Sequence, residues 1–161
     1  MTRFIKFFLF LAIYQIGFYS LQAQKNWVQS YSAGYVDKQG RFAGGSEIMH
    51  IVSHKGKLYS ANGYWMDSRW VIPPEGQKQS AQVLRLDSND SEWQVDLDTG
   101  KSNELGLEYM KGNVLKSVTF TKDQNGNKLK SPVKLLVMAS GSNFERGGAV
   151  SVWVRDDNSE T

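Results

Sequence analysis

Two short segments contain the residues best suited to bind a ligand. Each places an aromatic side chain close to an acid and an arginine. A sugar ring could stack on the aromatic plane while the carboxylate and the guanidinium form charge-assisted hydrogen bonds with its hydroxyl groups. The sequence therefore predicts a site for a carbohydrate or another small polar ligand. The candidate residues are Tyr64, Trp65, Asp67, Arg69 and Trp70 in the first segment, and Asn143, Phe144, Glu145 and Arg146 in the second.

The same residues have a purely structural interpretation, and two other functions compete with binding. The acid and arginine of each segment could pair with neighbouring loops, while the tryptophans pack between structural units. An extracellular hydrolase or oxidase acting on glycans is an alternative, because hydrolysis of a glycosidic bond needs two carboxylates several ångströms apart. The sequence identifies no catalytic residue, since spacing alone cannot pair the available acids. A protein-interaction scaffold is the third possibility. The acids considered are Asp67, Glu75, Asp96, Asp98 and Glu145.

No metal or cofactor site is predicted. His50 and His54 would lie on one face of a strand about 13 Å apart, which is too far to share a zinc ion. The chain has no cysteine. Residues 123–127 contain Asp and Asn around Gly126, but they lack the glycine position and the bidentate glutamate of a calcium-binding loop. An Asn-Gly hairpin turn is the better interpretation of that segment.

The candidate ligand residues must be positioned by β-strands. Residues 48–54 and 57–62 are rich in strand-forming side chains and flank Lys55-Gly56, which is typical of a tight hairpin. Residues 82–87 and 92–98 form a second pair around a short polar turn at residues 88–91. Four consecutive strands with hairpin links predict an antiparallel meander.

The order of strands then repeats, with further strands predicted at residues 115–121, 133–140 and 149–155. Three matches define the repeat: Ile51 with Val118, Lys57-Leu58-Tyr59 with Lys134-Leu135-Leu136, and Asp87 with Asp156. The differences in length lie in the turns, where insertions are tolerated.

The first unit resembles a kelch-type blade of a β-propeller. The resemblance rests on residues 48–63, on Val83-Leu84-Arg85-Leu86-Asp87, and on Trp93 six positions after Asp87. It implies an all-β fold of four-stranded antiparallel blades, incomplete in this chain, with ligands bound on the face that carries the loops between second and third strands. The predicted division is a signal peptide at 1–23, a lead-in segment at 24–47, a first blade at 48–98, an inter-blade loop at 99–114 and a truncated second blade at 115–161.

The N-terminal residues predict export. Arg3 and Lys6 precede an apolar stretch at residues 7–21, and Ala23 provides a small residue at the cleavage edge. We expect a secreted or periplasmic protein that has no membrane association after cleavage. Residues 1–23 contain two of the 19 basic residues and none of the 16 acidic ones, which leaves 17 against 16 in the remainder. Scattered charges of both signs argue against a nucleic-acid partner.

A propeller closes only with at least four blades. We therefore expect that Thr161 is not the natural end of the protein and that further blades of the same parent protein are partners of these two. An isolated second blade would expose the apolar side chains of residues 149–155, which favours aggregation. A small self-contained β-sandwich or barrel is the alternative.

Overall fold

The computed structural model describes residues 27–64, 80–100, 109–141 and 150–158. The chain divides into two compact units, Met1–Ser30 and Tyr31–Thr161. Of the first unit only residues 27–30 are described; they have no regular secondary structure, and Trp27 and Val28 are exposed. The features that follow belong to the second unit.

The described part of the second unit consists of strands, turns and irregular segments, without a helix. The prediction of an all-β chain is therefore confirmed. The strands are β1 (Tyr35–Val36), β2 (Phe42–Ala43), β3 (Glu47–His54), β4 (Lys57–Gly63), β5 (Gln82–Leu86), β6 (Gln94–Asp98), β7 (Val114–Lys122), β8 (Lys128–Gly141) and β9 (Val150–Val154).

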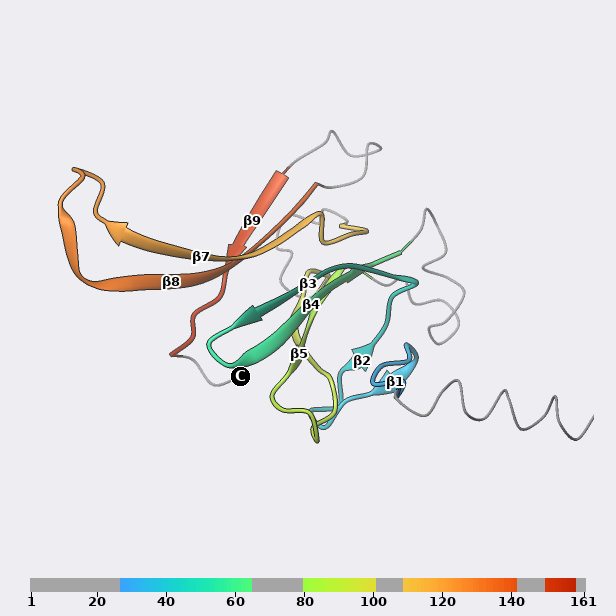
Figure 1. Ribbon diagram of the computed structural model, residues 1–161. Helices are drawn as coiled ribbons and strands as arrows, with labels where there is room; N and C mark the ends of the chain where they lie inside the picture. The colour runs from blue at the N-terminus through green and yellow to red at the C-terminus, as the bar shows by residue number, and fades with distance from the viewer. Residues whose placement is uncertain (1–26, 65–79, 101–108, 142–149, 159–161) are drawn as a thin grey trace, which may run out of the picture. The chain divides into compact units, whose positions relative to one another are not determined.

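The strands form two larger antiparallel sheets in which neighbours in the sequence are neighbours in space. Sheet 1 has the order β3-β4-β5-β6, and sheet 2 has the order β7-β8-β9 (Figure 1). The four-stranded meander predicted from residues 48–98 is confirmed. The turn at Lys55-Gly56 has positive φ angles of 46° and 80°, as the tight hairpin turn that matches strand twist requires.

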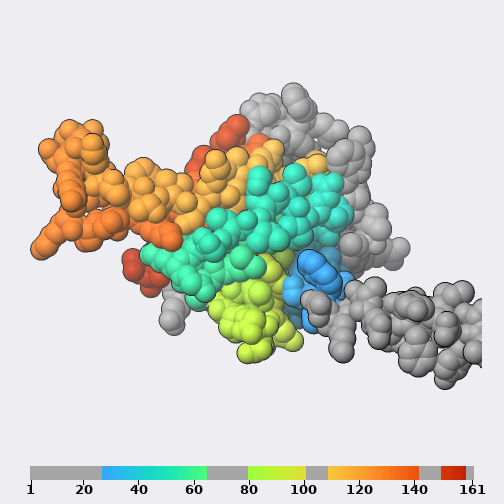
Figure 2. Space-filling model, in the orientation of Figure 1, coloured from blue at the N-terminus to red at the C-terminus, as the bar shows by residue number. Residues whose placement is uncertain are grey.

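The strand predicted at residues 133–140 extends further than expected. β8 starts at Lys128 and contains Pro132, which lies where the pairing of β7 with β8 shifts register between Phe120 and Lys122. A proline is tolerated there because an irregular position needs no ladder hydrogen bond. The β7–β8 hairpin extends clear of the rest of the described chain (Figure 2), and residues 119–134 are exposed apart from Leu129.

The two sheets pack face to face. Side chains of β4 and β5 form one core cluster with side chains of β7 and β8. We call the side of sheet 1 that enters this cluster face A, and its opposite side face B. The residues of this cluster are Tyr59, Ala61, Val83, Leu115, Leu136 and Met138.

Face B of sheet 1 is covered by the segment that precedes β3. Leu84 and Val95 are fully buried there against Ala43 of β2, and Tyr31 and Tyr35 pack on the same cluster. The hydroxyl of Tyr35 donates a hydrogen bond to the carbonyl oxygen of Trp93. The short β1–β2 hairpin therefore lies within the segment that the sequence identified only as a lead-in.

Cross-strand pairing corrects the register of the predicted repeat. Tyr59 pairs with Arg85 in sheet 1, and Val137 pairs with Val154 in sheet 2. With Asp87 matched to Asp156, Tyr59 corresponds to Val137 and Ala61-Asn62-Gly63 corresponds to Ala139-Ser140-Gly141. This register differs by one residue from the predicted match of Lys57-Leu58-Tyr59 with Lys134-Leu135-Leu136, so that match and the match of Asp87 with Asp156 cannot both hold.

The first-strand match also changes. Val52 pairs with Tyr59, and Lys116 pairs with Val137, so Val52 corresponds to Lys116 and Ile51 does not correspond to Val118. A slip of one residue moves every side chain to the other face of a strand. In the corrected register Leu136 corresponds to Leu58, which packs on face B of sheet 1. The side of sheet 2 that carries Leu136 and Met138 is therefore its face B. Face A of sheet 1 therefore packs on face B of sheet 2.

Candidate functional site

One edge of the two sheets collects the strand ends that lead to the segments 65–79, 101–108 and 142–149. β4 and β8 end there, β5 and β9 begin there, and an isolated bridge joins Gly63 to Lys111 in the segment before β7. We call this end of the sheets the loop edge; the term refers to the ends of the strands and not to an outer strand. It is marked by Gly63, Gln82, Asp98, Lys111 and Gly141. The opposite edge has the short turns at residues 55–56, 87–93 and 123–127.

Backbone hydrogen bonds hold the loop edge together. The backbone amide of Tyr64 donates to the carbonyl of Met110 at 2.9 Å. The backbone amide of Gly112 donates to the backbone carbonyl of Asn62 at 3.1 Å. The backbone segments around Gly63 and Lys111 approach so closely that a Cβ atom on Gly63 would lie 2.8 Å from the Cα atom of Lys111. Glycine is therefore required at the end of β4.

Two buried amide side chains support the loop edge from face B of sheet 1. The side chain of Asn62 donates a hydrogen bond to the backbone carbonyl of Gly44 at 2.5 Å. It also accepts one from the backbone amide of Gln82 at 2.7 Å. The side chain of Gln82 accepts the amide of Gly44 and donates to the carbonyl of Phe42. Both side chains are almost inaccessible to water. These bonds hold the ends of β4 and β5 against the lead-in segment.

Sheet 2 uses the corresponding position in the same way. Ser140, the counterpart of Asn62, is buried and donates its hydroxyl to the carbonyl of Lys111, in the segment that precedes β7. In both sheets a polar residue near the end of the second strand thus binds the backbone that enters the first strand.

Among the predicted ligand-binding residues, Tyr64 lies within the described part of the chain. Its side chain is buried, and burial raises the pKa of its hydroxyl to about 12. The hydroxyl lies beside Gly44, where any Cβ atom would collide with it. The other candidates lie outside the described residues: Trp65, Asp67, Arg69, Trp70, Asn143, Phe144, Glu145 and Arg146.

The two histidines contact separate groups between the sheets. The imidazole of His54 lies 2.8 Å from the Ser117 hydroxyl and 3.0 Å from the Asp157 carboxylate. His50 contacts the carbonyl of Asn113 at 2.7 Å. Within the described ranges, no cluster of three or more histidine, aspartate or glutamate residues is arranged to hold a metal ion.

An ionic cluster that the sequence did not indicate joins the two sheets. Asp96 of β6 contacts Arg85 at 2.8 Å and the Nε of Arg155 at 2.8 Å, while Arg155 also contacts Asp157 at 2.7 Å. Burial lowers the pKa of the Arg155 guanidinium, but its hydrogen bonds to Asp96 and Asp157 outweigh burial and raise the pKa above its ordinary value. The guanidinium also lies 5.6 Å from the ring centre of Tyr59.

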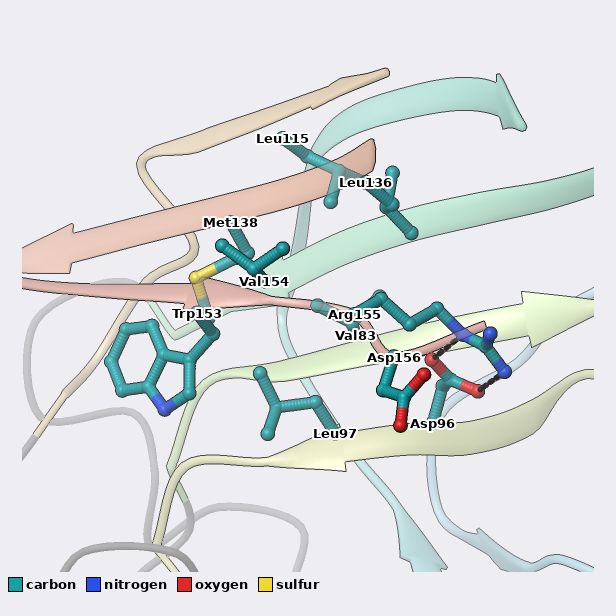
Figure 3. A pocket seen from close by; sticks show the side chains of 10 residues that line it. All are labelled: Val83, Asp96, Leu97, Leu115, Leu136, Met138, Trp153, Val154, Arg155 and Asp156. Carbon is teal, nitrogen blue, oxygen red and sulfur yellow. Dashed lines mark hydrogen bonds and ion pairs between the residues drawn. The ribbon is translucent and has the colours of Figure 1, made fainter. Parts of the chain in front are cut away.

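A cavity of about 180 Å³ lies beside this cluster, between face A of sheet 1 and face B of sheet 2. Figure 3 shows the Arg155–Asp96 pair at one end and the indole of Trp153 at the other. Apolar side chains provide most of the wall, so the cavity is shaped to take an apolar group. It is lined by Val83, Asp96, Leu97, Leu115, Leu136, Met138, Trp153, Val154, Arg155 and Asp156.

Comparison with known proteins finds no matching family model, no matching curated protein and no matching solved structure. In the described part of the chain, no helix has the length and apolar character needed to cross a membrane.

Proposed function

We propose that this chain is part of an exported β-propeller that binds a carbohydrate or another small polar ligand at its loop edge. The observation that carries the proposal is the convergence at one edge of the strand ends that flank residues 65–79, 101–108 and 142–149. Binding residues occur preferentially on loops that a rigid scaffold positions. Two of these segments contain the aromatic, acidic and arginine residues identified from the sequence.

The packing of the sheets supports the propeller part of the proposal. Two meander sheets stack face to face with a core between them, as adjacent blades do. Face A of sheet 2 carries exposed valines, and a further blade of the same parent protein would cover them. Export is supported by the charged and apolar pattern of residues 1–23.

The test is a glycan array with the full chain, followed by calorimetric titration of each hit. Trp65→Ala and Trp70→Ala should each weaken binding by about fivefold, because stacking on an aromatic plane contributes on the order of 1 kcal/mol. Trp27→Ala is the matched control, since Trp27 is an exposed tryptophan outside both sheets. Unchanged affinity in both loop variants would contradict the site.

The same titrations separate the competing functions. An enzyme would turn over a bound glycan and lose turnover in Asp67→Asn or Glu145→Gln while it retained binding. A chain that binds no glycan or small polar ligand would contradict the proposal and favour an interaction scaffold.

A further inference from the structure

The β7–β8 hairpin of sheet 2 is much longer than its counterpart in sheet 1. In the corrected register, the pair Val118↔Leu135 corresponds to the pair His54↔Lys57, which closes the β3–β4 hairpin. Sheet 1 then turns at Lys55-Gly56, whereas sheet 2 continues through residues 119–134 before the chain returns. We call residues 119–134 the arm.

The arm adds no side chain to either core cluster of the described chain. Its residues are exposed apart from Leu129, and Figure 2 shows the arm projecting from the rest of the described chain. A two-stranded hairpin is only marginally stable in water by itself. Burial therefore does not explain why the hairpin is extended, and a contact with another molecule is favoured.

The arm is the basic part of a chain that is otherwise slightly acidic. It contains four lysines and one acid, which leaves 13 basic and 15 acidic residues in the remainder of residues 24–161. Within the described residues, none of the four lysines forms an ion pair. The lysines are Lys122, Lys128, Lys130 and Lys134.

Two of these lysines are arranged unfavourably unless an anion is bound. Lys122 pairs with Lys128 across the hairpin, and like charges directly opposite one another destabilise a strand pair. The acid of the arm, Asp123, is committed to the turn, where its carboxylate accepts the backbone amides of Asn125 and Asn127, both at 2.9 Å. An anionic group between the two lysines would remove their repulsion.

We propose that the arm binds an acidic polysaccharide, at a site separate from the loop edge. The carboxylate, sulfate or phosphate groups of the polymer contact the four lysines, each of which provides a compact charge on a flexible stem. A sugar ring packs on Phe120, which is half-exposed and pairs with Val133. A polymer fits better than a single anion, because the lysines are distributed over both strands.

Two other polyanions fit the arm less well. The tip of the arm, residues 123–127, contains no apolar side chain, so it lacks the group that would anchor it in a lipid bilayer. A nucleic acid is disfavoured by the proposed export of the protein, on which the choice of a polysaccharide rests.

The test is titration of the full chain into fluorescently labelled polygalacturonate and dextran sulfate, which carry carboxylate and sulfate groups respectively. Both polymers should bind saturably, and uncharged dextran should not bind at the arm. Raising the salt from about 50 mM to about 200 mM should weaken binding about tenfold, because contacts between lysines and a polyanion release counterions.

Removal of the opposed lysines tests the arm directly. Lys122→Gln with Lys128→Gln should weaken polygalacturonate binding about fivefold or more and make its salt dependence shallower. The same variant should keep or raise its thermal midpoint, since a repulsion is lost, so weaker binding cannot be ascribed to misfolding. The matched control, Lys38→Gln with Lys57→Gln, removes the same charge from lysines that already pair with acids, and it should bind like wild type.

A second pair of changes gives an independent measurement. Lys130→Gln with Lys134→Gln should weaken binding by a similar factor. Trp65→Ala lies outside the arm and should bind polygalacturonate as wild type does, so the loop-edge proposal and the arm proposal fail separately. Loss of polygalacturonate binding in Trp65→Ala alone would assign the acidic polymer to the loop edge and overturn the arm site.

Three other results would overturn the proposal. One is an absence of binding to both acidic polysaccharides. Another is equal binding by wild type and both lysine variants. The third is tighter binding to a DNA duplex, or to vesicles of equal parts phosphatidylcholine and phosphatidylglycerol, than to either polysaccharide.

Discussion

Sheet 1 and sheet 2 differ in how much of their surface is covered. Face A of sheet 1 packs on sheet 2, and its face B packs on the lead-in segment. In sheet 2, face B is covered by sheet 1 and by Tyr109, whose ring meets Trp153 edge-on with the ring centres 5.0 Å apart. Its face A presents Val150, Val152 and Val154, which are 78%, 62% and 54% exposed.

The comparison shows that neighbours, and not residue type, decide burial in this fold. Val83 and Val152 occupy the same register position on face A, yet Val83 is 3% exposed and Val152 is 62% exposed. A large exposed apolar patch usually marks an interaction surface. Sheet 1 thus has both faces covered, whereas face A of sheet 2 is exposed in the described part of the chain.

The largest expected effect concerns the ionic cluster that joins the sheets. Asp96→Ala leaves Arg85 and Arg155 without their shared, nearly buried carboxylate, and it should lower the free energy of unfolding by about 3–5 kcal/mol. Chemical denaturation measures the change. Glu92→Ala is the control, since its pair with Lys38 is exposed and should contribute less than about 1 kcal/mol. A loss below 1 kcal/mol for Asp96→Ala would mean that this cluster does not hold the sheets together.

A matched pair of valines tests the difference between the two A faces. Val83→Ala should cost about 2 kcal/mol, because it removes buried methyl groups and leaves a cavity, whereas Val152→Ala should change stability by less than about 0.5 kcal/mol. Thermal and urea unfolding of both variants give the values. Equal losses would indicate that face A of sheet 2 is covered in solution.

Substitution of the buried polar residues near the ends of β4 and β8 should lower the free energy of unfolding by different amounts, because the two residues make different numbers of hydrogen bonds. Asn62→Ala breaks two buried bonds and should cost about 2 kcal/mol, while Ser140→Ala should cost about 1 kcal/mol. The reverse order in urea denaturation would mean that Asn62 does not make both of these hydrogen bonds in solution.

Acid titration should reveal the contribution of Asp157. Burial raises the pKa of its carboxyl, but hydrogen bonds from Lys55, His54 and Arg155 outweigh burial and hold the pKa well below its ordinary value. A carboxyl with a depressed pKa in the folded state stabilises the fold above its unfolded pKa of about 4, and this contribution is lost as the pH falls toward the folded value. Unfolding free energies below pH 4 should therefore fall more steeply in wild type than in Asp157→Asn. Parallel curves would show that these contacts are absent in solution.

Local sequence signals predicted the strands and turns well, because each depends on a few adjacent residues. Lys55-Gly56 indicated a tight turn, and the hydrogen bonds of the Asp123 side chain to the amides of Asn125 and Asn127 confirm the expected turn at residues 123–127. The register of the repeat was missed by one residue, because apolar side chains in β8 occur on both faces and alternation alone could not separate Leu135 from Leu136.

The contacts between the sheets were beyond sequence reasoning. Arg85 and Arg155 appeared only as charged residues in strands, and nothing local indicated that both approach Asp96. The lead-in hairpin was missed because β1 and β2 have two residues each. Most predicted ligand residues lie in segments outside the described residues, so their assignment remains a prediction from composition and from the position of the loop edge.

Methyl-to-methyl NOE measurements test most directly the claim that face A of sheet 1 packs on face B of sheet 2. In a sample with labelled alanine, leucine, valine and methionine methyl groups, Ala61 and Val83 should show cross-peaks to Leu115, Leu136 or Met138. They should show none to Val150 or Val152, which are exposed on the other face of sheet 2. Cross-peaks from Ala61 or Val83 to Val150 or Val152 would contradict both the corrected register and the stacking of one repeated unit on the next.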